Sequence, residues 1–373
     1  MLDNDPKPLE MLIPGLIPKT SIVTISAPGG TSKSYLCLAL AINLATNTPF
    51  LGKFQPGKRR RVLIVNGEDD DAEVHRRMKN ILAAVQADLS AEEKEEMLDR
   101  LAKRLRIAFT HNEPDFVLYS TKTFGENSRR ISDFCTIDLK FPVDLIILDN
   151  LTVMHDADHN SADLASGFMR ELKRIHKDTA ATIILIAHTN KSSQDGNLYS
   201  RLASASVLGS TAFSNNSRLV ISMTQVTAND GLDFGKDIAT SDVVAMKISK
   251  ANSGNLIKDI LFLKRNHDGV LEYIEPIVVD PRHESYQVLS VIKNQPELNK
   301  TMLVEKLRND CKMSKNAAFN LIERVLADKL IEQRETGVNN GKCFKITRLG
   351  EELYNEVASE FEQEEPDSSE LCA

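Results

Sequence analysis

The stretch Ser26–Ser34 (Ser-Ala-Pro-Gly-Gly-Thr-Ser-Lys-Ser) constrains this chain more than any other. An apolar run, Ser21–Ile25, leads into it, and a helix-like run, Tyr35–Ala45, follows it. A small-residue loop between a strand and a helix is the context of a phosphate-binding loop, because its backbone N–H groups and the helix dipole both favour phosphate oxygens. Lys33 would then reach the β and γ phosphates of a nucleotide, and the Ser34 hydroxyl would bind Mg²⁺.

Eight consecutive residues form the predicted nucleotide-binding segment, namely Pro28, Gly29, Gly30, Thr31, Ser32, Lys33, Ser34 and Tyr35. The spacing matches G-x-x-x-x-G-K-[ST] with two departures, since Ala27 stands at the first Gly and Ser32 stands just before Lys33. The second departure matters more, because a Cβ at that point demands an uncomfortable backbone conformation or crowds the phosphate. Loops of small residues that end in Lys-Ser also occur by chance between a strand and a helix.

Buried strand patterns and amphipathic helix patterns alternate between Arg61 and Ala187. The predicted strands are Arg61–Asn66, Leu105–Thr110, Asp144–Asp149 and Thr182–Ala187, and the predicted helices are Asp71–Ala87, Ala91–Arg104, Asn127–Cys135 and Ser161–Lys177. This alternation predicts an α/β fold in which helices cover both faces of a mostly parallel sheet. From Leu219 onward four strands follow without helices between them, and we expect them to extend one edge of the sheet as antiparallel strands.

The segment Pro276–Glu284 separates this core from a second pattern of three helical runs and two strands. The two strands, Leu330–Arg334 and Lys342–Thr347, are joined through an Asn-Gly step, which is a hairpin signal. Three helices and a hairpin within about 65 residues predict a winged helix. We therefore expect an irregular lead-in at residues 1–20, a phosphate-loop core at 21–280, a winged helix at 285–355 and an acidic disordered tail at 356–373.

Charge and cysteine content narrow the class of protein. The net charge is −7, but residues 285–350 carry 12 Lys and Arg against 7 Asp and Glu, whereas residues 351–373 carry 9 acids and no Lys or Arg. The basic module is thus compatible with nucleic acid. Five scattered cysteines without a Cys-x-x-Cys pair argue against disulfides and structural zinc, and they favour a reducing cytoplasm. No apolar run approaches the roughly 18 residues of a membrane span, and we expect no membrane partner.

Acidic residues follow two of the buried strands. Asp149 ends a strand at the edge where open α/β sheets bind ligands, so we predict that it holds Mg²⁺ through water. It could instead cap the next turn. Glu68 is the candidate that orients or deprotonates an attacking water, while part of the run Asp69–Asp71 caps a helix. His188 follows the next strand and could sense the γ phosphate, although a lone His is more often structural.

Taken together, these segments resemble the RepA-type hexameric replicative helicases within the RecA-like ATPases, over roughly residues 10–275. The segments that carry the likeness are Ile13–Pro18, Ala27–Ser34, Val65–Asp69, Leu148–Asn150, Ala187–Asn190, Leu208–Phe213 leading to Arg218, and Lys250–Gly254. Singly they are moderate signals, but their order and spacing are specific. The resemblance implies a RecA-like core, ATP and Mg²⁺ as ligands, and a homo-oligomeric ring, a hexamer, around single-stranded DNA.

The resemblance also implies roles for single residues. Lys33 and Ser34 would bind phosphate and Mg²⁺, Glu68 would be the catalytic base, and Asp149 would be the Walker B acid. His188 would couple the state of the phosphate to a DNA-binding loop.

Two further residues would act across a subunit interface if the resemblance holds. Arg218 would be an arginine finger, and Lys250 would reach a neighbour's nucleotide. Both could instead be ordinary surface charges. Asn252 stands where some ring helicases carry a second arginine. Because of this departure and those at Ala27 and Ser32, the resemblance does not decide whether the chain hydrolyses ATP.

The third helical run of the C-terminal module carries candidate DNA contacts. Asn316, Asn320 and Arg324 recur on one polar face, and Lys312 and Lys315 stand at its start. Asn and Arg suit base edges, and lysines suit phosphates, so this face could read duplex DNA. A solvated face on a protein-interaction module is the alternative.

Two functions follow from these observations. The first is an ATP-dependent DNA helicase or translocase in the replication of a plasmid, phage or similar element, a context that only the resemblance implies. The second is a nucleotide-gated DNA-binding regulator or replication initiator with weak or no ATP turnover. Glu68, Asp149 and Arg218 favour the first, whereas Ser32 and the C-terminal module favour the second.

Overall fold

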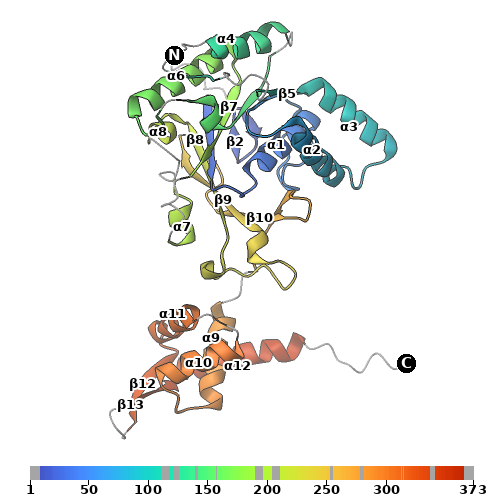
Figure 1. Ribbon diagram of the computed structural model, residues 1–373. Coiled ribbons are helices and arrows are strands. Elements are labelled where there is room, and N and C mark those ends of the chain that lie inside the picture. The colour runs from blue at the N-terminus through green and yellow to red at the C-terminus, as the bar shows by residue number, and fades with distance from the viewer. Residues whose placement is uncertain are drawn as a thin grey trace, which may run out of the picture. The chain divides into compact units, whose positions relative to one another are not determined.

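Figure 1 shows the computed structural model of the chain. It describes residues 9–110, 117–120, 126–138, 142–156, 158–189, 196–203, 211–252, 255–277, 281–311, 313, 315–336 and 341–364. None of the helices in these ranges is long and apolar enough to cross a membrane. The chain divides into unit 1, Met1–Pro276, and unit 2, Ile277–Ala373.

Within the described residues, unit 1 is built around a nine-stranded sheet in the order β11-β10-β9-β8-β3-β7-β6-β4-β5. Its strands are β3 (Ile22–Ala27), β4 (Val62–Asn66), β5 (Leu105–Phe109), β6 (Leu145–Asp149), β7 (Thr182–His188), β8 (Leu219–Gln225), β9 (Val243–Ala251), β10 (Leu261–Arg265) and β11 (Leu271–Ile274). The six strands from β8 to β5 are parallel, and β9, β10 and β11 continue the sheet in antiparallel fashion.

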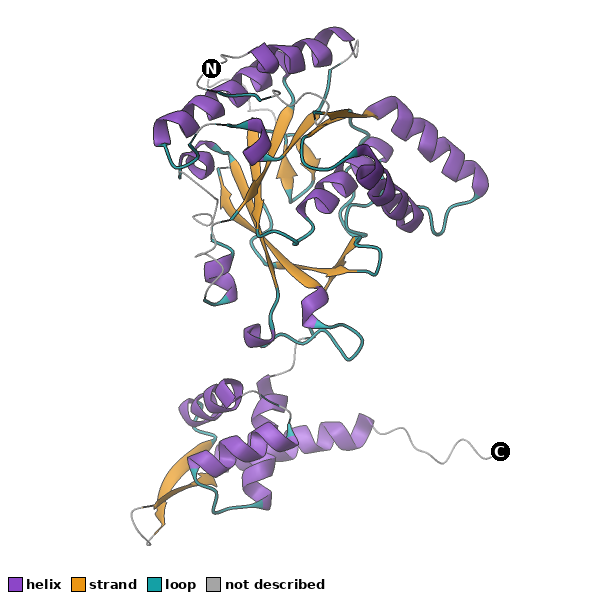
Figure 2. Cartoon of the chain, viewed as in Figure 1, coloured by secondary structure: helices purple, strands orange, loops and turns teal. Residues whose placement is uncertain are grey.

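Helices cover both faces of this sheet (Figure 2). One apolar cluster contains side chains of α1 (Lys33–Thr46), α2 (Asp71–Val85) and α3 (Ala91–Arg104), and a second contains those of α4 (Glu126–Asp133), α6 (Ala162–Thr179) and α8 (Ala212–Asn216). Along β3, Val23 and Ile25 belong to the first cluster and Ile22 to the second, because successive strand residues face opposite sides. The predicted α/β core, a mostly parallel sheet between helices, is confirmed.

Shorter elements connect the core. They are α5 (Leu151–Met154), α7 (Leu198–Arg201), the π-helical turn η1 (Phe134–Asp138) and the 3₁₀ turns η4 (Ala228–Asp230) and η5 (Thr240–Asp242). The antiparallel extension is confirmed for β9, β10 and β11 but is wrong for β8, which pairs parallel with β3. The reason is α8, which returns the chain to the start of β3, where the Arg218 N–H donates to the Ile22 carbonyl at 2.9 Å.

The lead-in predicted as irregular is partly ordered. A hairpin of β1 (Met11–Ile13) and β2 (Ile17–Pro18) turns at Gly15, whose φ is +74°. Four of its apolar side chains, Leu12, Ile13, Leu16 and Ile17, are at most 1% exposed and join the cluster around α1. Their burial removes apolar surface from water, which explains why this proline-rich segment folds.

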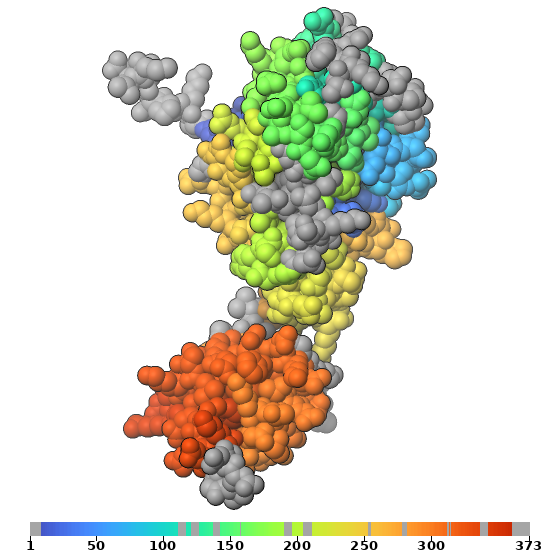
Figure 3. All heavy atoms as spheres, turned by 60° about the vertical axis from the view of Figure 1, so that its left-hand side comes forward, coloured from blue at the N-terminus to red at the C-terminus, as the bar shows by residue number. Residues whose placement is uncertain are grey.

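Unit 2 has a hydrophobic core of its own and forms a compact body, coloured orange to red in Figure 3. Its elements are α9 (Pro281–Asn294), α10 (Lys300–Asp310), α11 (Lys315–Ala327), β12 (Ile331–Thr336), β13 (Gly341–Ile346) and α12 (Arg348–Glu364). The strands β12 and β13 form an antiparallel hairpin, and Phe344 points into the core with 1% exposure.

The tail predicted as disordered from residue 356 begins as a helix, since α12 continues to Glu364. Its first turns pack on α9, where Tyr286 stacks on Tyr354 with ring centroids 4.8 Å apart. The ion pairs Lys293–Glu351 and Arg282–Glu356, at 2.8 and 2.7 Å, hold two of its acids. Val357 is fully buried, so apolar packing, besides the Arg282–Glu356 ion pair, explains why the segment after residue 355 is helical. Residues 365–373 lie outside the described residues.

Candidate functional site

The carboxyl ends of four neighbouring parallel strands, β3, β7, β6 and β4, meet at one edge of the sheet. A pocket of about 270 Å³ opens there, and its lining comprises Gly29, Gly30, Ser32, Lys33, Ser34, Tyr35, Glu68, Asp69, Arg77 and His188. Ser34 and Asp149 line a small adjoining cavity of about 20 Å³. The structure therefore brings together six predicted loop residues, both predicted acids and the predicted histidine.

The loop between β3 and α1 adopts left-handed backbone conformations at two positions. Gly30 has a φ of +75°, and Ser32, which caps α1, has a φ of +62° and a ψ of 29°. The Ser32 side chain makes no capping hydrogen bond that would offset the cost of roughly 1–2 kcal/mol for an L residue in this region. The remaining two predicted residues shape the loop, because the Thr31 hydroxyl donates to the Pro28 carbonyl at 2.7 Å.

Ser32→Gly should raise nucleotide affinity or turnover, because it removes a Cβ that would crowd the phosphate and lets the loop adjust to the nucleotide without strain. Relief of about 1 kcal/mol corresponds to roughly a fivefold change. Gly30→Ala is the matched converse, since it adds a Cβ at φ +75° where the space around it is open, and it should weaken binding. A nucleotide titration beside steady-state hydrolysis measures both. If neither parameter rises in Ser32→Gly, the loop accommodates the serine Cβ at no cost to binding.

Lys33 begins α1 and is only 6% exposed. Its Nζ donates to the carbonyl oxygens of Ala27 at 3.0 Å and Pro28 at 2.8 Å, and it lies 3.4 Å from His188 Nδ1. Burial lowers the pKa of the Lys33 ammonium, and the charges of Glu68 and Asp149 partly offset that effect. The loop thus folds around one cation at the floor of the pocket.

Glu68 is held from its backbone and from its carboxylate. The Asn66 Oδ1 accepts the N–H groups of Glu68 and Asp69 at 3.1 and 3.2 Å, and the Asn150 Nδ2 donates to Glu68 Oε2 at 2.5 Å. Gly67 has no room for a side chain, because a Cβ there would lie 2.6 Å from Val153 Cγ1. These contacts fix the carboxylate at the pocket.

Asp69 and Asp70, which follow Glu68, make different contacts. Asp70 caps α2, since its side chain accepts the Glu73 N–H at 2.7 Å, as the sequence predicts for part of the run. Asp69 instead binds the Arg77 guanidinium through two contacts of 2.6 and 3.0 Å. Arg77 lines the pocket and lies 5.4 Å from the Tyr35 ring centroid, a position that the sequence patterns do not indicate.

Asp149 is a buried carboxyl with an unused oxygen. Its Oδ1 has no hydrogen-bond partner among the described residues. Burial raises its pKa to about 6, with further increases from the charges of Glu68 and Asp69, while a hydrogen bond from Ser34 and the Lys33 charge lower it. A buried carboxylate oxygen beside a hydroxyl is the donor set that a hard cation such as Mg²⁺ prefers, so these residues fit the ion.

Asn150 connects the two sides of the pocket. Besides its contact with Glu68, its Nδ2 lies 3.5 Å from His188 Nε2, and its Oδ1 accepts the N–H groups of Thr152 and Val153 as the cap of α5. Burial and the neighbouring Lys33 lower the pKa of His188, which favours a neutral ring. The sequence predicts His188 but no role for Asn150, whose neighbours become visible only in the fold.

Arg218 and Lys250 lie away from this pocket. Arg218 precedes β8, is exposed, and sits beside the start of β3, whereas the phosphate loop follows the end of β3. At about 3.3 Å per residue, β3 alone separates them by roughly 17–20 Å. The Lys250 Nζ donates to the carbonyls of Ser214, Asn215 and Ser217 at 2.8, 2.8 and 3.0 Å, so it caps the end of α8.

The candidate DNA contacts of unit 2 separate into two groups. Lys315, Asn316 and Asn320 are exposed on α11. Arg324 is partly buried and forms an ion pair with Glu284 at 2.7 Å, so its guanidinium is engaged within unit 2. Lys312 lies outside the described residues.

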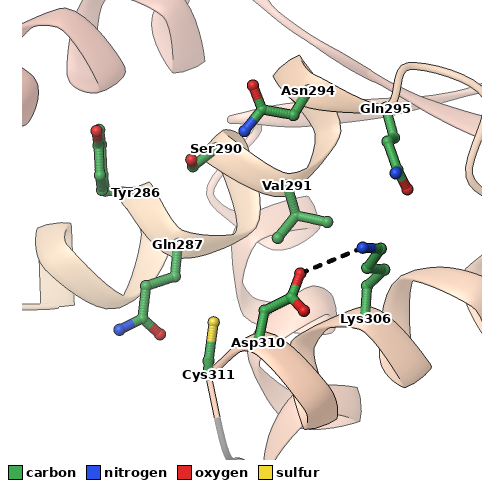
Figure 4. Close-up of a pocket in the computed structure, with 9 residues that line it drawn as sticks. All are labelled: Tyr286, Gln287, Ser290, Val291, Asn294, Gln295, Lys306, Asp310 and Cys311. Atoms are coloured by element: carbon green, nitrogen blue, oxygen red, sulfur yellow. Dashed lines mark ion pairs between the residues drawn. The ribbon is translucent and has the colours of Figure 1, made fainter.

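A second pocket, of about 300 Å³, lies in unit 2 between α9 and α10 (Figure 4). Polar side chains of α9 line one side, and the Lys306–Asp310 ion pair of α10, with a 3.6 Å separation, lies on the other. None of the predicted DNA contacts lines it.

Comparison with known proteins gives a family. A family model described as an AAA domain matches residues 1–194, more than half of the chain. Among solved structures, the chain is similar to a DnaB-like replicative helicase whose interactions with primase were described, with 14% identity and a TM-score of 0.47. That similarity covers 68% of this chain and 57% of the helicase chain. No curated protein matches the chain.

Proposed function

This chain belongs to the AAA domain family, and from that premise we propose that it is an ATP-hydrolysing DNA helicase or translocase. The subunits would form a homo-oligomeric ring, a hexamer, around single-stranded DNA in the cytoplasm. Replication of a plasmid, phage or similar element is the context, which the RepA-type resemblance supports.

One observation carries this proposal. Lys33, Ser34, Glu68 and Asp149 converge on adjoining cavities at the carboxyl edge of the sheet. The Lys33 charge would face the β and γ phosphates, and Ser34 and Asp149 would hold Mg²⁺. Mg²⁺, when bound, would neutralise charge on the phosphate oxygens.

Glu68 would supply the base. Its carboxylate would take a proton from the water that attacks the γ phosphorus, while the bond from that phosphorus to the bridging oxygen of ADP breaks. Asn150 holds the carboxylate at 2.5 Å and also lies 3.5 Å from His188. The position of Asn150 supports a role for His188 in relaying the phosphate state away from the pocket.

The positions of Arg218 and Lys250 support a ring. Both lie at the opposite edge of the sheet from their own phosphate loop, so they could act only at the nucleotide of a neighbouring subunit. The Lys250 Nζ would first have to leave the three carbonyls at the end of α8 to which it donates. An arginine supplied in this way stabilises the charge that develops on the phosphoryl group, a contribution of about 10³–10⁵ in rate.

Mixing inactive subunits tests this arrangement. Arg218→Ala subunits keep an intact pocket, and Lys33→Ala subunits keep the Arg218 side chain. In a mixed ring, Arg218 of a Lys33→Ala subunit would serve the pocket of an Arg218→Ala neighbour, so part of the hydrolysis that each variant lacks should return. Mixtures of Lys33→Ala with Glu68→Gln should stay inactive, because each of those subunits has a defective pocket. A monomer by light scattering with nucleotide at micromolar concentration would exclude the ring and with it the motor.

The direct test of the function is DNA-stimulated hydrolysis. Single-stranded DNA should accelerate ATP turnover by the full chain, and a forked duplex should be unwound only with ATP. A rate of hydrolysis that is the same with and without DNA would contradict the proposal, and so would nucleotide binding without any hydrolysis.

A second candidate function has its own supporting observation. Ser32 holds a left-handed conformation beside the catalytic lysine, and Lys33 is engaged by the loop carbonyls of Ala27 and Pro28. A strained loop of this kind would suit a nucleotide-gated DNA-binding regulator or replication initiator with slow turnover. Nucleotide-dependent duplex binding without hydrolysis would favour this function.

Unit 2 supports DNA binding in either case. We propose that it is a winged helix in which α11 enters the major groove and presents Lys315, Asn316 and Asn320. A contact from Lys312 is part of the same proposal, whereas the ion pair of Arg324 with Glu284 would first have to open.

A fragment of residues 277–373 should bind duplex DNA through the basic residues of 285–350, with strong salt dependence because each neutralised phosphate releases counterions. Deleting the acidic residues from 365 onward should tighten this binding at low salt. Lys315→Ala should weaken binding to all sequences alike, whereas Asn320→Ala should cost about 1–3 kcal/mol on a preferred site only. Arg348→Ala, in α12, serves as the matched control for lost charge. A fragment that ignores duplex DNA at low salt would reassign unit 2 to protein contacts.

A further inference from the structure

Arg265 belongs to no motif, yet it touches the phosphate loop. It ends β10, in the antiparallel extension, and its Nη2 donates to the Gly30 carbonyl at 2.9 Å and to Gln225 Oε1 at 3.4 Å. We propose that Arg265 is a positioning residue that aims the Thr31 N–H at the phosphates of the nucleotide. The inference rests on the proposed nucleotide binding.

The geometry of a single peptide links Arg265 to a backbone N–H group of the phosphate loop. The Gly30 carbonyl and the Thr31 N–H belong to one planar trans peptide, so they point in opposite directions. Because the Arg265 guanidinium of β10 holds the Gly30 carbonyl, the Thr31 N–H points away from Arg265. Gly30 and Ser32, which flank Thr31, both line the pocket. Thr31 is itself 3% exposed and does not line the pocket, so its N–H would serve an anion only from this fixed orientation.

Gly30 needs such a restraint. It has a φ of +75°, and a Cβ added to it would meet no atom within 4 Å, so no neighbour lies on that side of the residue. A glycine without packing contacts rotates its peptide unit readily. The Arg265 hydrogen bond supplies the missing restraint, and its charge makes that bond stronger than a neutral one.

Arg265 is itself held in place. The Gln225 Nε2 donates to the carbonyls of Ser241 and Val243, both at 2.7 Å, and Arg201 donates to the Gln225 carbonyl at 2.8 Å. The Gln225 side chain that faces Arg265 is therefore fixed by its own contacts. This arrangement presents the guanidinium to Gly30 in one orientation, as a positioning role requires.

The turn after β10 is anchored to the helix that follows the loop. The Tyr35 hydroxyl donates to the Asp268 carbonyl at 2.7 Å, and the Asn80 Nδ2 donates to the same carbonyl at 3.1 Å. A Cβ at Gly269 would lie 3.0 Å from the Tyr35 ring. These contacts fix β10 relative to α1, so Arg265 keeps its position relative to the phosphate loop.

Packing alone accounts poorly for this arginine. Its Nε is buried without a hydrogen-bond partner among the described residues. Burying an unpaired donor is unfavourable, so an apolar side chain would fill the same space at lower cost. The contacts of Nη2 are what an apolar residue could not supply.

Three variants of the full chain test the proposal. Arg265→Met keeps the length and removes the donors, Arg265→Lys restores a cation, and Lys264→Met makes the matched change one residue earlier on the other face of β10. Binding is measured with a fluorescent ADP and by competition with inorganic pyrophosphate, which has no base.

Arg265→Met should weaken ADP and pyrophosphate alike by about tenfold, the effect of one charge-assisted hydrogen bond. The KM for ATP should rise by a similar factor with kcat nearly unchanged, because ground state and transition state lose the same contact. Arg265→Lys should recover most of the affinity, and Lys264→Met should bind as the wild type does.

Unchanged binding by Arg265→Met, or an equal loss in Lys264→Met, would overturn the role of Arg265 while nucleotide binding stands. A loss for ADP without a loss for pyrophosphate would overturn it too, because the Thr31 N–H would then not serve phosphate. Failure of the wild type itself to bind ADP would overturn both this inference and the proposed function.

Discussion

Glu68→Gln should bind ATP with nearly unchanged affinity and hydrolyse it about 10²–10⁴-fold more slowly, the usual contribution of a general base. The amide has the same shape as the carboxylate, so it still meets Asn150 and keeps the backbone contacts to Asn66. Only the ability to accept a proton from water is lost. Single-turnover hydrolysis beside an equilibrium binding titration separates the two quantities.

Asp71→Asn is the matched control, because Asp71 lies nearby as an exposed carboxylate in the first turn of α2. Its turnover should equal that of the wild type. Normal turnover in Glu68→Gln would remove this residue from the mechanism, and loss of ATP binding would assign it to the pocket structure instead.

Lys33→Ala should reduce kcat/KM by more than about a hundredfold, because it removes the cation nearest the pocket floor. Nucleotide affinity should fall as well, since the Lys33 charge would contact phosphate in both the ground state and the transition state. The carbonyls of Ala27 and Pro28 also lose their donor, which loosens the loop. Calorimetric titration and steady-state hydrolysis measure the two effects.

Lys79→Ala provides the control for loss of a positive charge, because Lys79 is exposed on α2 and outside the pocket. Circular dichroism would show that both variants fold. Wild-type hydrolysis by Lys33→Ala would rule out the phosphate loop as the catalytic centre.

Local patterns were enough to predict the core and most of its pocket. A buried strand that ends in Asp149 is a signal within five residues, and parallel strands bring their carboxyl ends to one edge whatever their order. The same reasoning predicted an unfavourable backbone conformation at Ser32, which carries a Cβ and is left-handed in the structure. Such features depend on the chain near them and can therefore be predicted from sequence.

Features that depend on distant partners could not be predicted from the sequence. Asn150, Arg77 and Arg265 are ordinary polar residues until the fold brings Glu68, Tyr35 and Gly30 beside them. No periodicity records a contact across 235 residues, such as that between Arg265 and Gly30.

The wrong predictions have the same origin. The direction of β8 depends on where α8 returns the chain, and the helical structure of residues 356–364 depends on the burial of Val357 and on the ion pair of Glu356 with Arg282 of α9. Composition describes one segment without its neighbours. From composition alone, an acidic helix that packs on another element therefore cannot be distinguished from a solvated, disordered tail.

The crowding at Gly67 has a consequence for how the site can evolve. A Cβ at this position would meet Val153 Cγ1 at 2.6 Å and Thr110 Oγ1 at 2.9 Å, so the turn after β4 rests directly on α5. Since α5 follows Asp149, van der Waals contact between the two segments sets the separation of the two acids. The spacing of Glu68 and Asp149 thus depends on the absence of a side chain at residue 67 and on the sizes of the Val153 and Thr110 side chains, so a larger residue at any of these three positions would disturb it.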